Sequence, residues 1–204
     1  WARPALVPYP QKVVEREGAY LLATNVIAEA DVKWQKDAAI PAEGYKLSVT
    51  PSGATVWSSG DAGAFYAFQT LKQLARPQNV DVRVRPLEIP CVEIEDAPKF
   101  KWRGFMLDEA RHFMGKETVK KYIDLMSRVK MNVFHWHLTD DEGWRLEIKC
   151  HPEVHEKGSV RPEQMNHGAT EDNPSWNNEQ YGPYYYTHED VKEILDYAAK
   201  HFVK

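Results

Sequence analysis

The sequence is poor in the features that mark several large classes of protein. It has only two cysteines, Cys91 and Cys150, in 204 residues, which are too few for a disulfide framework and too far apart for a metal knuckle. No apolar run approaches the roughly 20 residues that a membrane span needs. The net charge is −4 and there is no basic stripe, so we expect neither nucleic acid nor a charged membrane surface as a partner.

The remaining composition is that of a globular protein rich in aromatic rings. Hydrophobic residues make up 43% of the 204 residues, which is ordinary for a soluble protein and leaves room for one or two domains. Seven Trp and ten Tyr are more informative. Their flat amphipathic rings serve protein cores and also the apolar faces of sugars, so they give a weak indication of a carbohydrate ligand.

The first 96 residues have the mixed pattern of an α+β domain. Apolar and polar residues alternate over residues 43–49 and 54–58, on either side of a Thr-Pro-Ser-Gly turn, which predicts a hairpin. A helix is predicted over residues 62–75, and further strands are predicted at 80–84 and 91–94. We therefore predict that residues 1–96 form an α+β domain.

After Asp96 strands and helices alternate, which is typical of an α/β fold. Apolar runs at residues 104–107 and 131–138 flank segment 116–129, whose apolar residues have the spacing of an amphipathic helix. The apolar positions of this helix are Val119, Tyr122, Ile123, Met126 and Val129. Strand, helix and strand of these lengths predict a parallel βαβ unit. Both apolar runs end in polar residues, and ligands bind beyond the carboxyl ends of such strands, so both polar clusters should face one pocket.

The rest of the chain fits the opening of a larger barrel. The polar stretch 151–183 is predicted to be a pocket-side loop. A final helix is predicted after Thr187, with Asp190 completing a capping box. Its apolar face should comprise Val191, Ile194, Leu195, Ala198 and Phe202. A complete (β/α)8 TIM barrel takes typically about 250 residues, so residues 97–204 are predicted to be the incomplete N-terminal part of one.

Adjacent carboxylates occur twice, as Asp108-Glu109 and Asp140-Asp141. Two carboxyl groups that act on one glycosidic bond must converge at about 5 to 9.5 Å. If Asp108 and Glu109 continue a strand, however, they point to opposite faces. From spacing alone we favour strand-end polarity and turn formation for both pairs.

Arg111 and two histidines are the other candidates for a site. An arginine just after a barrel strand can offer two parallel donors to sugar hydroxyls or a carboxylate, but an internal ion pair with Asp108 or Asp140 is equally compatible with the sequence. His135 and His137 share one face of a strand, and with Asp140 they could make a zinc site. The alternative, which we favour, is that both histidines line a barrel interior with hydrogen-bonded partners.

Several aromatic residues follow or end the predicted strands. Trp136 and Trp144 could stack on a ligand, although core packing is the commoner fate of tryptophan. Trp176 and the run Tyr184-Tyr185-Tyr186 lie in or after the long polar stretch, where they could provide ring platforms.

Five segments together resemble one known family. The strings WRGFMLDEARHFM, KMNVFHWHLTDDEGWRLEIK and GPYYYTHEDVKEILDYAAKHFVK closely resemble the β-N-acetylhexosaminidase family of retaining glycoside hydrolases. EGYKLSV and AGAFYAFQTLKQL resemble the small α+β domain that precedes the barrel in that family. The resemblance covers nearly the whole chain, with a small departure at Pro183, where the family usually has a second glycine.

This resemblance implies an exo-acting enzyme that removes terminal β-linked N-acetylglucosamine or N-acetylgalactosamine. Catalysis is assisted by the substrate, whose acetamido carbonyl attacks the anomeric carbon, so no protein nucleophile is needed. By the same resemblance, Arg111 binds hydroxyls of the terminal sugar, and Asp140 supports the general acid through a histidine. Trp144 and His137 are further candidates for contact with substrate. No cofactor or metal ion is expected.

The family's catalytic Asp-Glu pair follows its fourth barrel strand, which lies beyond Lys204. No catalytic acid is therefore expected within this chain, and the piece alone is predicted to be inactive. Two alternatives stay open: a non-catalytic sugar-binding module, and a metallohydrolase that uses His135, His137 and Asp140. We also expect that exposed strand edges and apolar helix faces let the isolated piece self-associate. The family implies an exported protein, either periplasmic, extracellular or lysosomal.

Overall fold

The computed structural model describes residues 4–24, 26–75, 87–165, 172, 175–177 and 179–204. The chain forms two compact units. The first comprises residues 1–103 with 127–131, and the second comprises 104–126 with 132–204. No helix within the described ranges is long and apolar enough to cross a membrane.

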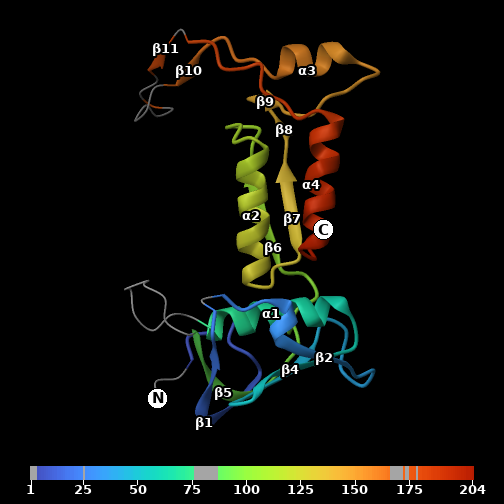
Figure 1. Cartoon of the computed structure of the whole chain (residues 1–204). Helices are drawn as coiled ribbons and strands as arrows, with labels where there is room; N and C mark the ends of the chain where they lie inside the picture. Colours follow the sequence, from blue (N-terminus) through green and yellow to red (C-terminus); the bar gives the residue numbers. More distant parts are fainter. Residues whose placement is uncertain (1–3, 25, 76–86, 166–171, 173–174, 178) are drawn as a thin grey trace. The chain divides into compact units, whose positions relative to one another are not determined.

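The first unit is a five-stranded sheet with one long helix (Figure 1). The strand order is β1-β5-β3-β4-β2, and neighbours are antiparallel except for the parallel pair β2 and β4. The strands are β1 (Lys12–Leu22), β2 (Val32–Lys36), β3 (Tyr45–Thr50), β4 (Gly53–Ser58) and β5 (Leu87–Asp96), and the helices are η1 (Glu29–Asp31) and α1 (Asp61–Leu74). The predicted hairpin and helix are therefore confirmed. The predicted strand at 91–94 is part of the longer β5, and the one at 80–84 lies outside the described residues.

The core of the first unit lies between the sheet and α1. In β3, Leu47 and Val49 are each 1% exposed while the residues between and around them are not buried, so the alternation seen in the sequence does separate two faces. Gly63 permits the close approach of α1, because a Cβ there would lie 2.1 Å from the backbone oxygen of Gly44. Any larger residue would push the helix away from the loop before β3.

A buried charge pair holds segment 127–131 in the first unit. Lys130 is 4% exposed, and its Nζ donates to Tyr45 Oη at 2.9 Å and to Asp96 Oδ2 at 3.0 Å. Burial lowers the pKa of Lys130 and raises that of Tyr45 well above its ordinary value. The sequence predicts a single break after Asp96, whereas the first unit also takes in this later segment.

The second unit opens with the predicted βαβ motif. Strand β6 (Gly104–Asp108) leads through α2 (Lys116–Arg128) to β7 (Val133–His137), and the two strands pair in parallel from Gly104 opposite Val133 to Asp108 opposite His137. Lys204 also lies beside β7. Its N–H donates to Asn132 O at 3.0 Å, and its C=O accepts from Phe134 N at 2.8 Å. This pattern is that of parallel pairing, so the chain returns to β7 as the next barrel strand would.

Short elements and one more helix complete the second unit. They are β8 (Thr139–Asp140), β9 (Gly143–Trp144), α3 (Pro152–Gly158), β10 (Gln164–Met165), β11 (Trp176–Asn177) and α4 (His188–Lys200). Stretch 151–183, predicted to be a loop, contains α3 and the β10–β11 pair. The predicted capping box of α4 is confirmed, because Thr187 Oγ1 accepts from Asp190 N at 3.1 Å and the Asp190 side chain bonds back to Thr187 N at 3.2 Å.

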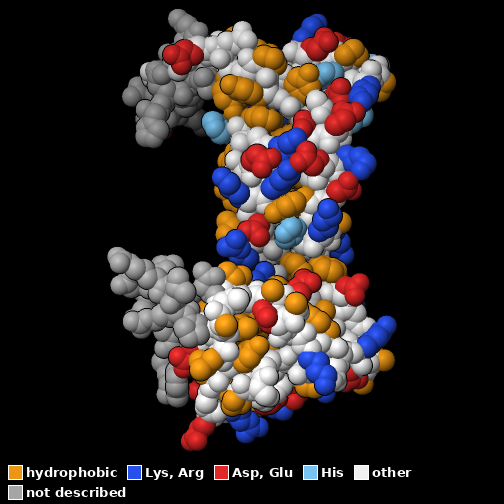
Figure 2. All heavy atoms as spheres, in the orientation of Figure 1, with side chains coloured by type: hydrophobic (Ala, Val, Ile, Leu, Met, Phe, Trp, Pro, Cys, Tyr) orange, Lys and Arg blue, Asp and Glu red, His pale blue; other side chains and the backbone are white. Residues whose placement is uncertain are grey.

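The apolar helix faces are narrower than predicted. Val119, Ile123 and Met126 are buried on α2, but Val129 lies beyond the helix and is 37% exposed. Leu195 of α4 is 60% exposed. Oppositely charged side chains are interspersed over these two helices (Figure 2).

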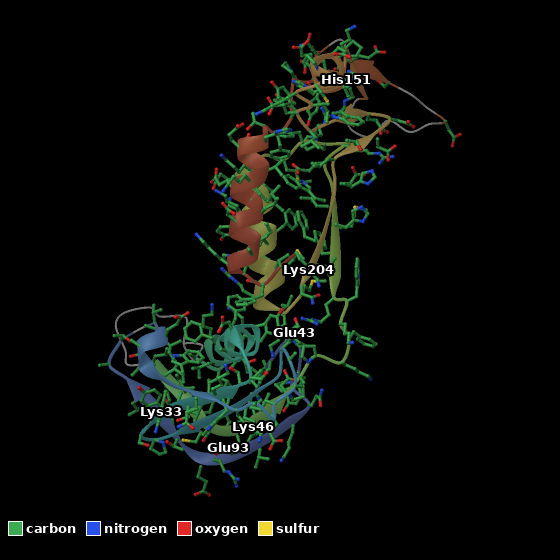
Figure 3. All side chains as sticks on the ribbon, turned by 90° about the vertical axis from the view of Figure 1, so that its right-hand side faces the viewer. Lys33, Glu43, Lys46, Glu93, His151 and Lys204 are labelled. Atoms are coloured by element: carbon green, nitrogen blue, oxygen red, sulfur yellow. The ribbon has the colours of Figure 1, made fainter. Side chains whose placement is uncertain are left out.

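Ion pairs join α2 to α4 directly. Lys116 Nζ lies 2.8 Å from Asp190 and 2.7 Å from Glu193, and Lys120 also bonds to Glu193. The acidic partners raise the pKa of Lys116, so it remains charged at all ordinary pH values. These ion pairs join the two helices, and both helices lie on the same side of β6 and β7 (Figure 3).

Candidate functional site

The candidate site lies where β6 and β7 end. Asp108 and His137 are the last residues of the two strands and are direct partners in the parallel register. Their side chains therefore lie at the same edge, as the sequence predicts. The hairpin of β8 and β9 follows at once and carries Asp140. Gly143 is required in this hairpin, because a Cβ there would lie 2.3 Å from Arg145 Nη2.

Arg111 is the residue on which the acidic groups converge. Its Nη1 lies 3.2 Å from Asp108 Oδ2 and also bonds to Asp140 Oδ2, and its Nε lies 2.9 Å from Glu142 Oε2. The internal ion pair that the sequence left open is therefore present. The Arg111 side chain is nevertheless 45% exposed, so the same guanidinium can still reach a ligand from solvent. We call Arg111, Asp108, His137, Asp140 and Glu142 the Arg111 cluster.

Asp140 is held in its ionised form. The backbone N–H of Asp141, the His137 ring and the Arg111 guanidinium lower the pKa of Asp140 to about 2. His137 Nε2 lies 2.9 Å from Asp140 Oδ2 and 3.3 Å from Arg111 Nη1. Since a carboxylate can only accept, His137 carries its proton on Nε2 when it bonds to Asp140. The cluster thus combines a fixed anion with an accessible cation.

The two histidines do not form the metal site that one alternative requires. His135 and His137 meet edge to face, with ring centroids 5.9 Å apart. In the part of the chain that the structure describes, no group of three His, Cys, Asp or Glu side chains is placed to hold a metal ion. The metallohydrolase alternative therefore has no supporting cluster among these residues.

Glu109 has a structural surrounding quite unlike that of its neighbour in the cluster. It is 0% exposed, and its carboxylate accepts from Tyr186 Oη at 2.7 and 2.9 Å and from Trp136 Nε1. Two backbone N–H groups also donate to it, from Met114 at 2.7 Å and Gly115 at 3.2 Å. Burial and the Glu109 carboxylate raise the pKa of Tyr186. Glu109 therefore fixes the loop after β6 through its bonds to the Met114 and Gly115 N–H groups.

Arg145 is the other buried charge of this unit, and sequence reasoning missed it. It is 0% exposed and donates to backbone oxygens of Ser159 at 2.9 Å, Ala110 at 3.0 Å and Glu109 at 3.2 Å. Longer bonds reach Tyr184 O at 3.3 Å and Glu142 O at 3.4 Å. The loop that carries Arg111 and the hairpin that carries Asp140 are therefore tied to one guanidinium.

The aromatic candidates lie mostly in packing positions. Trp136 packs against Tyr186 with ring centroids 4.6 Å apart. The Trp144 indole donates to Leu146 O at 2.8 Å, and its Cβ lies against Gly158 of α3. Tyr184 stacks on Phe113 at 5.5 Å yet remains 43% exposed, so it is the tyrosine of the run that best fits a ring platform. The Trp176 side chain lies outside the described residues.

Comparison with known proteins places these observations in a family. Residues 100–204 match the family model described as glycosyl hydrolase family 20, catalytic domain, and residues 26–97 match that of family 20, domain 2. The chain belongs to the β-N-acetylhexosaminidases of glycosyl hydrolase family 20. The resemblance read from the sequence strings is thereby confirmed.

Curated relatives in the family are much longer than this chain. A β-hexosaminidase of Porphyromonas gingivalis is 39% identical over an alignment 204 positions long, which covers 91% of this chain and 25% of that protein. A β-hexosaminidase of Akkermansia muciniphila is 36% identical over 199 residues, which cover 97% of this chain and 36% of that protein. The chain thus spans about a quarter to a third of the length of these relatives.

Solved structures in the family share the fold. The exo β-N-acetylglucosaminidase of Vibrio harveyi in complex with N-acetylglucosamine matches with a TM-score of 0.84 and 28% identity, over 98% of this chain and 35% of that one. A Streptomyces plicatus β-hexosaminidase variant in complex with its product, N-acetylglucosamine, matches with a TM-score of 0.80 and 27% identity, over 100% of this chain and 46% of that one. These neighbours have an N-terminal domain and a TIM-barrel catalytic domain, of which this chain covers part.

Proposed function

We propose that this chain is the N-terminal part of an exo-acting β-N-acetylhexosaminidase and that the Arg111 cluster binds the terminal amino sugar. The observation that carries the proposal is the position of Arg111: it stands beyond the carboxyl ends of two parallel strands, 45% exposed, with carboxylates of Asp108, Asp140 and Glu142 around it. Barrel enzymes bind their substrates at this end of the strands. The solved relative from Vibrio harveyi was captured with N-acetylglucosamine.

The chemistry of the cluster suits a sugar. A guanidinium offers donors in a planar fork that matches a pair of vicinal hydroxyls. The surrounding carboxylates fix the orientation of Arg111 before the sugar arrives, so less conformational entropy is lost on binding. Asp140, being ionised, can accept from a sugar hydroxyl or from a histidine that supports the general acid.

The bond-breaking step in this proposal needs residues beyond Lys204. The substrate's acetamido oxygen attacks the anomeric carbon, and the departing glycosidic oxygen takes a proton from a general acid. We propose that the general acid and its aspartate partner lie in the later part of the protein. The role of Asp140 is then electrostatic: it holds the supporting histidine and so tunes the proton affinity of the acid.

Hydrolysis of a chromogenic N-acetylglucosaminide tests the proposal. The full-length protein should turn over this substrate, and the 204-residue chain should not. In the full-length protein Arg111→Ala should raise KM by roughly ten- to a hundredfold, since lost hydrogen bonds to a charged group cost about 1.5–3 kcal/mol. Lys192→Ala, on the exposed side of α4, serves as the matched loss of a cation and should leave KM unchanged.

Three outcomes would count against the proposal. An unchanged KM in Arg111→Ala would remove the sugar-binding role of Arg111. Turnover by the 204-residue chain that is abolished by Asp108→Asn or Glu109→Gln, without unfolding, would place the catalytic pair in this chain. Binding of N-acetylglucosamine by the full-length protein without any turnover would favour the non-catalytic sugar-binding module.

A further inference from the structure

The sheet of the first unit has a second face, opposite the one that packs on α1. On this face the register aligns one residue from each strand in a continuous row. Lys12 of β1 pairs with Glu95 of β5, Glu95 with Lys46 of β3, Lys46 with Trp57 of β4, and Trp57 with Gln35 of β2. We call these residues the cross-strand row. With strands spaced at about 4.8 Å, the row is roughly 19 Å long.

A second line of polar side chains runs beside the cross-strand row. Glu93 of β5 pairs with Ser48 of β3, and Ser48 Oγ donates to Glu93 Oε1 at 2.8 Å. Figure 3 shows Lys46 and Glu93 on the side of the sheet away from α1. The surface is hollowed to a depression of about 430 Å³, which is lined by Glu93 and by residues of the cross-strand row. This volume lies within the range of small-molecule sites.

The charges around the depression balance. Three cations and three carboxylates line it: Lys12, Arg16, Lys46, Asp37, Glu93 and Glu95. Ion pairs join them across the strands, with Lys12 Nζ 2.9 Å from Glu95 and Lys46 Nζ 4.0 Å from Asp37. A polyanion or polycation therefore gains no net attraction here. A neutral ligand whose hydroxyls both donate and accept would find donors and acceptors in alternation.

Trp57 supplies the apolar part of the surface. It is half-buried, and its Nε1 donates to Gln35 Oε1 at 2.5 Å, which fixes the ring across β2 and β4. A fixed indole beside a charged, hydrogen-bonding row offers a platform for the C–H face of a sugar ring. Cross-strand ion pairs would by themselves stabilise the sheet. They do not explain the depression or the hydrogen bond that fixes the Trp57 indole beside it.

We propose that this face of the first unit is a second carbohydrate site, which binds a neutral oligosaccharide laid across the strands. The Trp57 ring stacks on one sugar, and Lys46, Glu93 and Glu95 bond to hydroxyls of the next. The site lies within one unit and is separate from the Arg111 cluster. It does not depend on the proposed hydrolytic function, because none of its residues takes part in that chemistry.

Binding of soluble oligosaccharides to the full chain tests this site. The neutral probes are the tetramer of β-1,4-linked N-acetylglucosamine and cellotetraose, and a heparin tetrasaccharide is the charged comparison. Binding of each is measured by isothermal titration calorimetry. The protein is the Arg111→Ala variant, in which the Arg111 cluster is disabled. At least one neutral tetramer should bind, and the heparin fragment should bind at least tenfold more weakly. Adding Trp57→Ala should lower the affinity for the neutral tetramer at least tenfold.

Trp34→Ala is the matched control, because Trp34 is 40% exposed and contacts Phe68 of α1 rather than the open face. Arg111→Ala with Trp34→Ala added should bind the neutral tetramer with the same affinity as Arg111→Ala alone. If Trp57→Ala does not fold, amide chemical-shift mapping on Arg111→Ala keeps the test decisive. The neutral tetramer should change the amide shifts mainly of residues in β3, β4 and β5. Failure of both neutral tetramers to bind, equal loss in Trp34→Ala, stronger binding of heparin, or shifts confined to the second unit would each overturn the proposal.

Discussion

Replacement of Arg145 by methionine is the sharpest test of how the second unit is held together. Arg145 is completely buried, and its guanidinium donates to Ser159 O, Ala110 O and Glu109 O within 3.2 Å. Methionine has a similar length and fills much of the same space but has no donor. Arg145→Met therefore removes the Arg145 donors to Ala110 O and Glu109 O while changing packing little, and Ser159 O keeps only its bond from Tyr184 N at 3.2 Å.

The magnitude follows from these bonds. A hydrogen bond to a charged group contributes about 1.5–3 kcal/mol, and a carbonyl left buried and unpaired costs about 1–3 kcal/mol. Part of this loss is returned, because the variant no longer buries a charge. We expect the free energy of unfolding of the second unit to fall by about 3–5 kcal/mol, a large share of the ~5–15 kcal/mol that stabilises a typical domain. Arg145→Lys should lower the free energy of unfolding by roughly half as much, because its ammonium keeps the charge but cannot reach the same set of oxygens.

Hydrogen exchange under urea measures each unit separately. Amides of β6, β7 and α4 should lose protection in Arg145→Met, while those of β3 and β5 in the first unit should not. Lys192→Met is the control. It removes a cation whose side chain is 76% exposed and should change the free energy by no more than about 0.5 kcal/mol. A loss below about 1 kcal/mol in Arg145→Met, or an equal loss in the control, would refute the role assigned to Arg145.

Three further predictions follow from single residues. Glu109→Gln should lower the free energy of unfolding by about 2–3 kcal/mol, because an amide keeps only one acceptor oxygen for the donors around it; thermal unfolding checks this, and an unchanged Tm contradicts it. Asp140 should titrate with a pKa of about 2 by NMR. Because this pKa is depressed, its contribution to stability is present above the unfolded value of ~3.9 and is lost as the pH falls towards 2; Arg111→Ala should raise the pKa, and no rise would contradict the observed contact. Gly63→Ala should lower Tm by several degrees, since its Cβ would lie 2.1 Å from Gly44 O; an unchanged Tm would show that the helix shifts at no cost.

The elements that sequence predicts well are those with a strong local pattern. The sequence predicts the βαβ motif from Gly104 to His137 because each strand is a short apolar run and α2 repeats its apolar residues at helical spacing. The sequence predicts the cap of α4 because the two residues that form it, Thr187 and Asp190, lie within four positions of each other. For the same reason, the sequence predicts that Asp108 and Arg111 lie together at the carboxyl end of β6.

The features that sequence misses depend on contacts between distant residues. Arg145 bonds to backbone oxygens, which leave no trace in residue type, and Glu109 is completed by Tyr186 from far along the chain. The sequence predicts that Leu195 lies on the apolar face of α4, but its side chain is 60% exposed. Its exposure depends on which parts of the chain pack on α4 and not on its apolar character. Pairing of β1 with β5 likewise joins segments that local pattern cannot connect.

A crystal structure of the full-length protein with N-acetylglucosamine tests the role of the Arg111 cluster most directly. The sugar should lie beyond the ends of β6 and β7, with ring hydroxyls within hydrogen-bond distance of the Arg111 guanidinium and the Asp140 carboxylate. A sugar bound elsewhere with the Arg111 cluster unchanged, or a metal ion held between His135 and His137, would contradict the account.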